Sequence, residues 1–434
     1  MKNIFASHRI RGPWVAGALL PLLAAPAMAV DFSTADGKYT LSVAGNVNGD
    51  YVYSNCATNT AGHPAAPVAG GLACVGDGGG NSVSSIDNGL LPAAITGGIV
   101  TTQDGIDIGA HFGFYPGIVT HTGGDPNNAN GGGNNTALGT AALDVRQVYL
   151  TFGNKDVGTV LVGRNIGLFG QDVILNDMTL LGVGGPGGAA SPSPGNTTLG
   201  GIGLGYIYTD WLAQLNYTTP DFAGFNLTGG VFEPINSLTE AATAENKKAP
   251  GFHGKAAYTL PIADGVKFYA SATFITQEQD YDTAGALAPI ADQIATHYSY
   301  TGTGYDIFAR IDVQDFEAFG YYYHGSGIGT TGLFVLGDAG LGNKRDSDGY
   351  MAQLTYKFGP LKLGVNYGDS RLDLASGEVN PTLVRSNRKA TGGLYYSLTK
   401  NLTLLAEYSN VRSEAQNGGA DNANTFNVGA FVGF

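Results

Sequence analysis

Apolar and polar residues alternate along most of this chain, in segments of about ten residues. In the segment 305–313, tyrosine, isoleucine, alanine and valine occupy the odd positions, whereas Asp306, Arg310 and Asp312 occupy even positions. The same period of two recurs in many other segments, 361–368 among them. Such a period predicts β-strands that present one face to apolar and the other to polar surroundings.

Sixteen segments of this kind can be counted, and an even number places both ends of the series on one side of the sheet. The segment near Leu91 is irregular because it is rich in glycine and alanine, and in the segment near Asp144 the parity of Arg146 is that of Val148. Fourteen and eighteen strands are the alternative counts. The segments begin near Tyr39, Leu91, Ile106, Asp144, Thr159, Leu204, Phe225, Phe252, Val266, Tyr298, Phe316, Asp348, Leu361, Arg388, Asn401 and Asn424.

The connections between these segments alternate in length. Short turns include 103–105 and 359–360, whereas long connections rich in Gly, Asn, Pro and Ser cover 121–141 and 167–203. A soluble antiparallel sheet with one wet face would show the same side-chain alternation. Short turns on one side, long loops on the other and aromatic residues near segment ends favour a transmembrane antiparallel β-barrel. We therefore predict an all-β fold, a sixteen-stranded barrel with short periplasmic turns and long external loops.

A barrel of this size has a physical consequence for function. Because every backbone polar group in hydrocarbon must be paired, the sheet has to close on itself. At sixteen strands the interior is too wide for side chains to fill, so it holds an aqueous channel. A polar inner face around such a lumen predicts a pore for the passive diffusion of ions and small hydrophilic solutes.

Composition and charge narrow the classes of function. Lys and Arg number 22 against 35 Asp and Glu, which gives a net charge of −13, whereas a nucleic-acid-binding protein needs a basic surface. The 23 tyrosines and 20 phenylalanines are not typical of a disordered chain. Because charges on external loops are screened beyond about 8 Å, the acidic excess predicts only a weak preference for cations.

The first 29 residues predict a cleaved signal peptide. A basic start and an apolar run precede Ala27-Met28-Ala29, which fits an A-x-A cleavage site. The mature chain, residues 30–434, is then one barrel domain located in the cell outer membrane. Cys56 and Cys74 would meet an oxidising compartment, so we predict a disulfide that closes the loop between them.

Other classes of function fit parts of the pattern. An enzyme built on a barrel needs a nucleophile with a base in reach, but no G-x-S-x-G occurs and His324 with Ser326 lacks a third partner, so we expect no enzyme. An adhesion or structural barrel would have a blocked lumen, and a substrate-specific channel would show saturable current. The cysteines and histidines lack ligand spacing, so we expect neither a metal nor another cofactor.

Three stretches resemble the Gram-negative general porins, a family of trimeric, sixteen-stranded outer-membrane barrels. The first, DVRQVYLTFGNKDVGTVLVG at 144–163, is similar to the family's fourth and fifth strands with their short turn, and Arg164 follows it. The second is LNYTTPDFAGFNL at 215–227. The third is the hairpin LYYSLTKNLTLLAEYSN, followed by a last strand that ends in Phe434, which resembles the signal read during barrel insertion.

This resemblance implies a constriction. The family's third external loop folds into the barrel, and by position that loop is 165–203 here, with Asp172 and Asp177 as its acids. In the family such acids face a basic wall, which implies that Arg146 and Arg164 line the pore. Strand parity alone adds further cations to the lumen side: Arg310, Lys267, Lys357, Lys362 and Lys389.

The resemblance also implies partners. The chain would form a homotrimer in a bilayer that contains lipopolysaccharide, would exchange small hydrophilic solutes and ions, and would bind no nucleic acid. Small residues of the second segment and its neighbour would suit the contact wall of the trimer: Ala93, Ala94, Gly97, Gly98 and Ala110.

Overall fold

The structure is a computed structural model that describes residues 29–59, 68–74, 82–118, 143–185, 197–236, 244–245, 247–283 and 296–434. The predicted signal peptide therefore lies outside the described residues, apart from Ala29. The predicted long loop 121–141 also lies outside them. No helix in the described ranges is long and apolar enough to cross a membrane.

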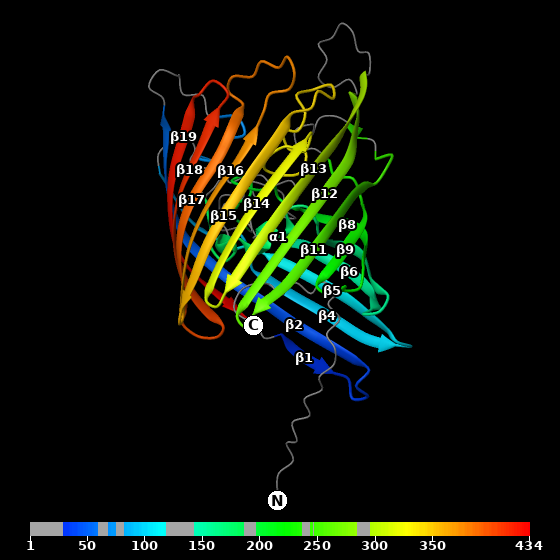
Figure 1. Cartoon of the computed structure of the whole chain (residues 1–434). Coiled ribbons are helices and arrows are strands. Elements are labelled where there is room, and N and C mark those ends of the chain that lie inside the picture. The colour runs from blue at the N-terminus through cyan, green and yellow to red at the C-terminus, as the bar shows by residue number, and fades with distance from the viewer. Residues whose placement is uncertain are drawn as a thin grey trace, which may run out of the picture.

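Sixteen antiparallel strands form a closed barrel whose strands are strongly tilted (Figure 1). Each strand pairs with the next one along the chain, and β19 pairs with β2 to close the ring. The sixteen strands are β2 (Tyr39–Asn59), β4 (Ala94–Gln103), β5 (Ile106–Pro116), β6 (Leu143–Asn154), β7 (Gly158–Ile166), β8 (Trp211–Thr218), β9 (Phe225–Phe232), β11 (Gly251–Ala263), β12 (Val266–Thr283), β13 (Thr296–Val313), β14 (Phe316–Ser326), β15 (Asp346–Phe358), β16 (Leu361–Leu372), β17 (Val384–Ser397), β18 (Leu402–Ala415) and β19 (Ala420–Gly433).

Short elements complete the sheet and the interior. The strands β1 (Val30–Ser33) and β3 (Ser82–Asp87) pair with opposite edges of β2, and β10 (Ala244–Glu245) pairs with β12. The helix α1 (Gln171–Asn176) and the 3-10 turn η1 (Met178–Leu180) lie in the connection between β7 and β8.

The predicted barrel of sixteen strands is confirmed, and most predicted starts lie within four residues of the observed ones. The exception is the segment near Leu204, because β8 begins at Trp211. Residues 204–208 alternate like a strand, but Leu204 and Tyr206 are fully buried in a loop inside the barrel. The alternation of apolar and polar residues alone does not distinguish a β-strand from a loop whose alternate side chains are buried.

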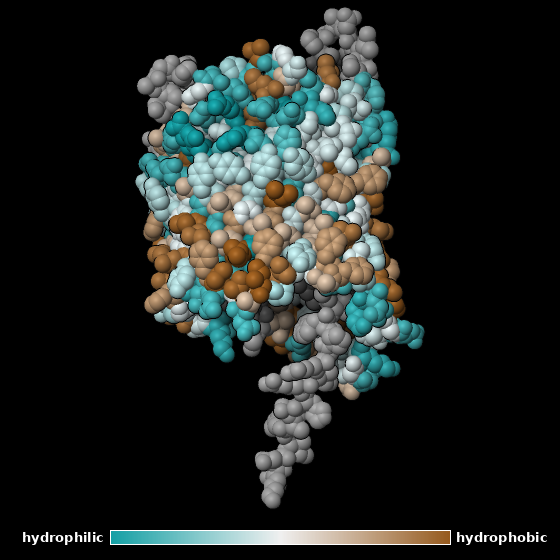
Figure 2. Space-filling view, in the orientation of Figure 1, coloured by the Kyte–Doolittle hydropathy of each residue, from teal (hydrophilic) through white to brown (hydrophobic). Residues whose placement is uncertain are grey.

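The two faces of the barrel differ as the alternation predicts. On β15 and β16, Leu354 and Val365 point outward and are 43% and 55% exposed, whereas Gln353 and Asn366 point inward and are buried. Figure 2 shows that the outward apolar residues form a band around the lower half of the visible surface, below a hydrophilic zone. This band is the part of the surface that hydrocarbon would contact.

A β-bulge in β6 sets the direction of Arg146. Gln147 pairs with Gly113 and Val145 pairs with Phe114, so Arg146 has no counterpart in β5. One extra residue on one strand reverses the parity on its far side. Val145 and the residues beyond Gln147 therefore keep apolar side chains outward, while Arg146 points inward and is buried. The bulge explains why the alternation of apolar and polar residues is irregular in the segment near Asp144.

Candidate channel constriction

The described residues of the connection between β7 and β8, 167–185 and 197–210, lie inside the barrel, as α1 does in Figure 1. Phe169, Val173 and Ile207 of this connection are fully buried and belong to one apolar cluster with Phe308 and Tyr323 of the wall. Burial of this apolar surface holds the loop in the lumen. The prediction that the third external loop folds into the barrel is confirmed.

Asp172 anchors the start of this loop to β11 and β12. Its carboxylate lies 2.6 Å from Lys255 Nζ and accepts hydrogen bonds from Tyr269 Oη, at 3.0 Å, and from Ser271 Oγ. The side chains of Asp172 and Lys255 are only 12% and 11% exposed. An enclosed ion pair with two further donors fixes the position of α1 in the lumen.

The end of α1 is held by two other wall residues. Arg310 of β13 donates a hydrogen bond to Asn176 Oδ1 and lies 3.1 Å from the carboxylate of Asp312. Gln353 of β15 donates to the carbonyl of Asn176 at 2.8 Å and accepts from the backbone N–H of Met178 at 2.7 Å. Arg310 therefore faces the lumen, as parity indicated, and contacts the loop there.

Asp177 lies inside the loop and is 3% exposed. Its carboxylate caps η1 by accepting from the backbone N–H and the hydroxyl of Thr179, at 2.9 and 2.8 Å. It also accepts from Tyr206 Oη at 3.0 Å and Asn366 Nδ2 at 3.1 Å. These four neutral donors satisfy a carboxylate that shapes the loop rather than facing open water.

The far end of the loop is bound to β17 and β18. Glu407 accepts hydrogen bonds from the backbone N–H groups of Val183 and Gly184, both at 2.9 Å, and from Tyr395 Oη at 2.6 Å. Lys389 donates to the carbonyl of Gly200 at 3.0 Å. Strand parity predicts the lumen side for Lys389. Glu407 is a functional residue that the sequence reasoning misses, although it is the one acid on the inward face of its alternating segment.

A second segment narrows the lumen beside this loop. The backbone N–H groups of Leu90 and Leu91 donate to the carbonyls of Gly182 and Leu180, at 2.7 and 2.9 Å. On the wall side, Asn48 Nδ2 donates to the carbonyl of Leu91 at 2.6 Å. This packing explains why the strand predicted near Leu91 begins only at Ala94.

The two arginines of the matched hairpin lie on opposite faces of the wall. Arg146 is on the lumen side, 3.0 Å from the carboxylate of Asp144 and 5.2 Å from the ring centroid of Tyr115. Arg164 pairs across the sheet with Val148 and shares its outward face. The assignment of Arg164 to the pore wall is therefore wrong, because β7 has no bulge to reverse its parity as β6 does.

Four cations line the lumen on neighbouring strands near the short turns. They are Lys267, Arg310, Lys357 and Lys362, on β12, β13, β15 and β16. Register places the carboxylates of Asp312 and Glu317 on the same inner face. Lys357 and Lys362 are direct cross-strand partners. The described inner face of β12–β16 thus carries an excess of positive charge toward the periplasmic end.

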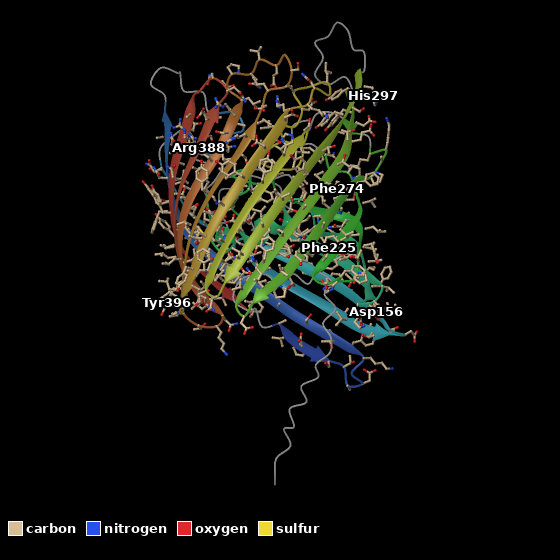
Figure 3. All side chains as sticks on the ribbon, in the orientation of Figure 1. Asp156, Phe225, Phe274, His297, Arg388 and Tyr396 are labelled. Carbon is tan, nitrogen blue, oxygen red and sulfur yellow. A yellow bond between two sulfur atoms is a disulfide. The ribbon has the colours of Figure 1, made fainter. Side chains whose placement is uncertain are left out.

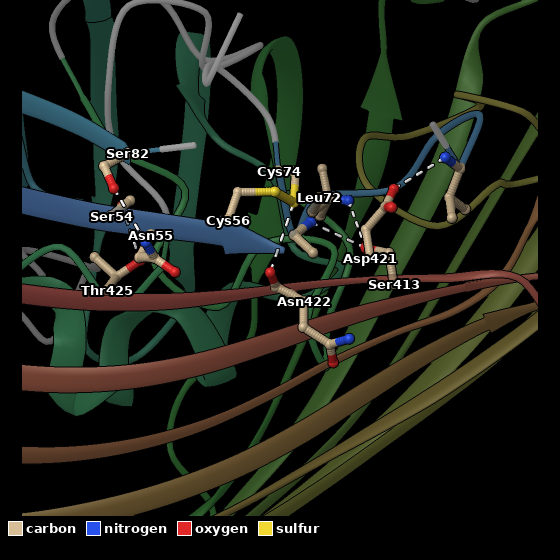
Figure 4. The surroundings of a disulfide bond; sticks show 12 residues. Ser54, Asn55, Cys56, Leu72, Cys74, Ser82, Ser413, Asp421, Asn422 and Thr425 are labelled. Atoms are coloured by element: carbon tan, nitrogen blue, oxygen red, sulfur yellow. Dashed lines mark hydrogen bonds between the residues drawn. A yellow bond between two sulfur atoms is a disulfide. The ribbon is translucent and has the colours of Figure 1, made fainter. Parts of the chain in front are cut away.

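Cys56 and Cys74 form a disulfide in the structure, with their Cα atoms 5.4 Å apart (Figure 4). It ties the segment 68–74 to the end of β2. The same segment is bound to the barrel wall, because the backbone N–H of Leu72 donates to Ser413 Oγ at 2.8 Å. The disulfide thus closes a loop whose described part, residues 68–74, lies against the inner side of β18.

These features define a class of protein: a closed transmembrane β-barrel whose polar lumen is narrowed by a loop folded inside it. The match to a family model is consistent with this class. The Gram-negative porin family model matches residues 16–416, and the chain belongs to that family. It is a porin channel, and the family supports the outer membrane as its location. No curated protein sequence matches the chain.

Solved structures of outer-membrane proteins share the fold. The outer membrane channel DcaP of Acinetobacter baumannii is 17% identical, with a TM-score of 0.62, over 93% of this chain and 99% of that one. OmpF of Salmonella typhi, in complex with daunomycin, is 14% identical, with a TM-score of 0.53, over 93% and 100%. OmpT of Vibrio cholerae is 13% identical, with a TM-score of 0.51, over 91% and 98%.

Proposed function

We propose that this porin lets ions and small hydrophilic solutes diffuse passively through its lumen. The observation that carries the proposal is the internal loop, which is anchored at both ends to a wall whose inner face is polar. A fixed loop in a wide barrel sets the cutoff of a pore without closing the barrel. The proposal requires no cofactor and no chemical step.

The charges of the lumen support selection by electrostatics. Asp172 is compensated by Lys255, whereas Asp177 is hydrogen-bonded by neutral donors inside the loop and does not face open water. The cations Lys357 and Lys362 stand below the loop. Rings or arcs of charge in a narrow pore bias which ions pass. The positive charges of Lys357 and Lys362 favour anions, which is opposite to the weak cation preference that the total charge predicts.

A second candidate is a substrate-specific channel of the same architecture. The observation that favours it is the second inserted segment, because Leu90 and Leu91 hydrogen-bond to the constriction loop. Two packed segments leave a narrower passage than one loop would. Saturable current that a particular solute blocks is the result that this candidate predicts.

The proposal also covers where the protein is located and how its copies assemble. Residues 1–29 act as the export signal, and the mature barrel lies in the outer membrane among phospholipid and lipopolysaccharide. Three copies associate through the outward face of the wall that contains β4 and β5. The protein is not an enzyme.

Conductance across a planar bilayer tests this proposal. The refolded mature barrel is expected to give stepwise, ohmic openings, and the reversal potential across a salt gradient gives the ion preference. Glu407→Ala, which frees Val183 and Gly184, is expected to raise the open-channel noise severalfold. Glu414→Ala is the matched control, because it removes the same charge from the same strand on the outward face. Folded barrels without openings would contradict the proposal.

A further inference from the structure

Three arginines gather around one carboxylate on the outer surface of the barrel. Arg385 and Arg388 of β17 and Arg412 of β18 each have a guanidinium nitrogen 3.7 Å from a carboxylate oxygen of Glu414. Arg388 and Arg412 are direct cross-strand partners, as are Ser386 and Glu414. We call these three arginines, with Glu414, the outer arginine cluster.

The cluster lies on the outward face of the wall. Arg388 has the parity of Leu394 and Tyr396, which are 51% and 42% exposed, whereas its neighbour Lys389 points inward and is buried. Figure 3 shows Arg388 at the upper part of the barrel edge and Tyr396 at the lower rim of the same side. The three arginine side chains are between 37% and 60% exposed.

The height of the cluster matches the upper border of the apolar band. The eight residue steps from Tyr396 to Arg388 rise about 21 Å along the barrel axis, at about 3.4 Å per step and a tilt of about 40°. The apolar band of such barrels is about 25 Å tall. Leu394, Gly392 and Ala390 fill the outward positions between the two residues. Arg388 therefore stands where lipid headgroups begin.

The guanidinium groups of the cluster have N–H donors that are not used in hydrogen bonds to the protein. Among the described residues, none of the three donates a hydrogen bond to a protein acceptor, and Arg412 Nε is buried without a partner. The nearby Arg371 differs, because it donates twice to Asp369, at 3.2 and 3.0 Å, and lies over the Tyr350 ring. Within the cluster, three positive charges meet one carboxylate. The next acid on this face, Asp369, is the cross-strand partner of Arg388 but is already bound by Arg371.

We propose that the outer arginine cluster binds the phosphate group of a lipid in the outer leaflet. Guanidinium forks match the oxygens of a phosphate, and a charged acceptor forms the strongest bonds with them. A lipid is favoured over a soluble anion because the wall directly below is apolar, with Leu394 and Leu404 exposed where acyl chains would lie. The site is independent of what passes through the lumen, so its failure would leave the proposed conductance untouched.

Binding of diphosphoryl lipid A, counted by native mass spectrometry on the barrel in detergent, tests the site. The triple variant R385Q/R388Q/R412Q is expected to bind about 100-fold more weakly, because each basic residue near an anionic lipid surface contributes about fivefold in affinity. Glu414→Gln is expected to bind more tightly, because it removes the competing carboxylate. A merely structural role for Glu414 would not give that gain.

A matched control removes the same charge at the opposite rim. Lys38, Lys155 and Lys400 lie in exposed positions at the short-turn end, and K38Q/K155Q/K400Q is expected to bind like the unmodified protein. Unchanged binding by the arginine variant, with its conductance intact, would overturn the proposal. Equal binding of lipid A without phosphates would also overturn it. Displacement of lipid A by an equal concentration of inorganic phosphate would show that the site takes a free anion and not a lipid.

Discussion

At the scale of single residues, the acids of the constriction loop are committed to fixed partners. Asp172 joins Lys255, and Asp177 caps η1. An isolated charge in a packed loop is costly, so each carboxylate is balanced by a cation or by several donors. The consequence is that single substitutions here act on the position of the loop before they act on the field in the pore.

Asp172→Asn is expected to lower the free energy of unfolding by about 3 kcal/mol, because it leaves Lys255 charged and enclosed. The double variant D172N/K255M is expected to recover most of that loss. Asp156→Asn is the control, since Asp156 forms only an exposed pair with Lys155, and such pairs contribute about 1 kcal/mol or less. Denaturant unfolding of barrels in vesicles measures all three, and an unrecovered double variant would contradict the pairing.

An external ion pair makes the loops sensitive to acid. Glu378 accepts from Arg345 Nε and Nη2, at 2.9 and 2.6 Å, and from the backbone N–H of Ala375. The hydrogen bonds from Arg345 lower the pKa of Glu378 from 4.5 to about 2. A depressed pKa contributes stability that is complete above the unfolded value and is lost as the pH falls toward the folded one.

Hydrogen exchange in residues 373–383 is therefore expected to rise between pH 4.5 and pH 2, after correction for the intrinsic rate. Glu378→Gln should exchange faster than the unmodified protein at neutral pH and should show little further change in this window. The exchange rate is expected to rise because protonation of Glu378 removes the carboxylate charge that holds Arg345. Protection in the unmodified protein that stays constant down to pH 2 would refute this account.

At the scale of elements, the parity of each strand decides which charged side chains face the lumen. Lys357 and Lys362 face each other across the turn between β15 and β16 and point inward. Their charges add because both stand on the same short stretch of wall. We therefore expect the ion preference of the proposed pore to depend on this hairpin, together with Lys267 of β12 and Arg310 of β13.

Removal of the two charges in K357Q/K362Q is expected to move the reversal potential toward cations by several millivolts in a tenfold salt gradient. The control K155Q/K400Q changes the net charge equally at exposed turns, where screening weakens the effect. Equal shifts in both variants would mean that total charge, and not the hairpin, sets the preference.

Much of the barrel could be predicted from the sequence because one face of each strand is apolar. Two features escaped that reasoning. The irregular parity of Arg146 indicates a disturbance in the strand but does not show that a bulge causes it, and Arg164 keeps the parity of a regular strand, outward with Val148. The anchors of the loop were also hidden, because Glu407 and Val183 are distant in sequence and meet only when the loop folds inward.

At the scale of the whole molecule, the small residues of β4 and β5 separate into two sets. Gly97 and Ala110 lie on the outward face, opposite Phe112 and Ile99. Ala94 is instead buried on the lumen side. The outward set leaves a wall that another copy could approach closely, which is the contact proposed for the trimer.

Gly97→Trp is expected to convert the trimer to monomers in native mass spectrometry, because it places a large side chain in that contact. A Cβ at Gly97 meets only ordinary contact, with Ser42 O at 3.5 Å, so the barrel itself should fold. Gly392→Trp is the matched control, since Gly392 is outward on β17 and has open space around its Cβ. Monomers in both variants, or trimers in both, would contradict the proposed wall.

The seam between β19 and β2 joins strands from opposite ends of the sequence. Asn427 pairs with Val52, and the backbone N–H of Phe434 donates to the carbonyl of Gly45 at 2.9 Å. In the folded molecule the order of strands is therefore a ring with no first member. A rearranged chain that starts at another short turn, with β19 linked to β2, would trace the same ring. Biosynthesis does impose an order, because two bare edges persist until the final strand arrives, and an exported chain must be kept from aggregating until then.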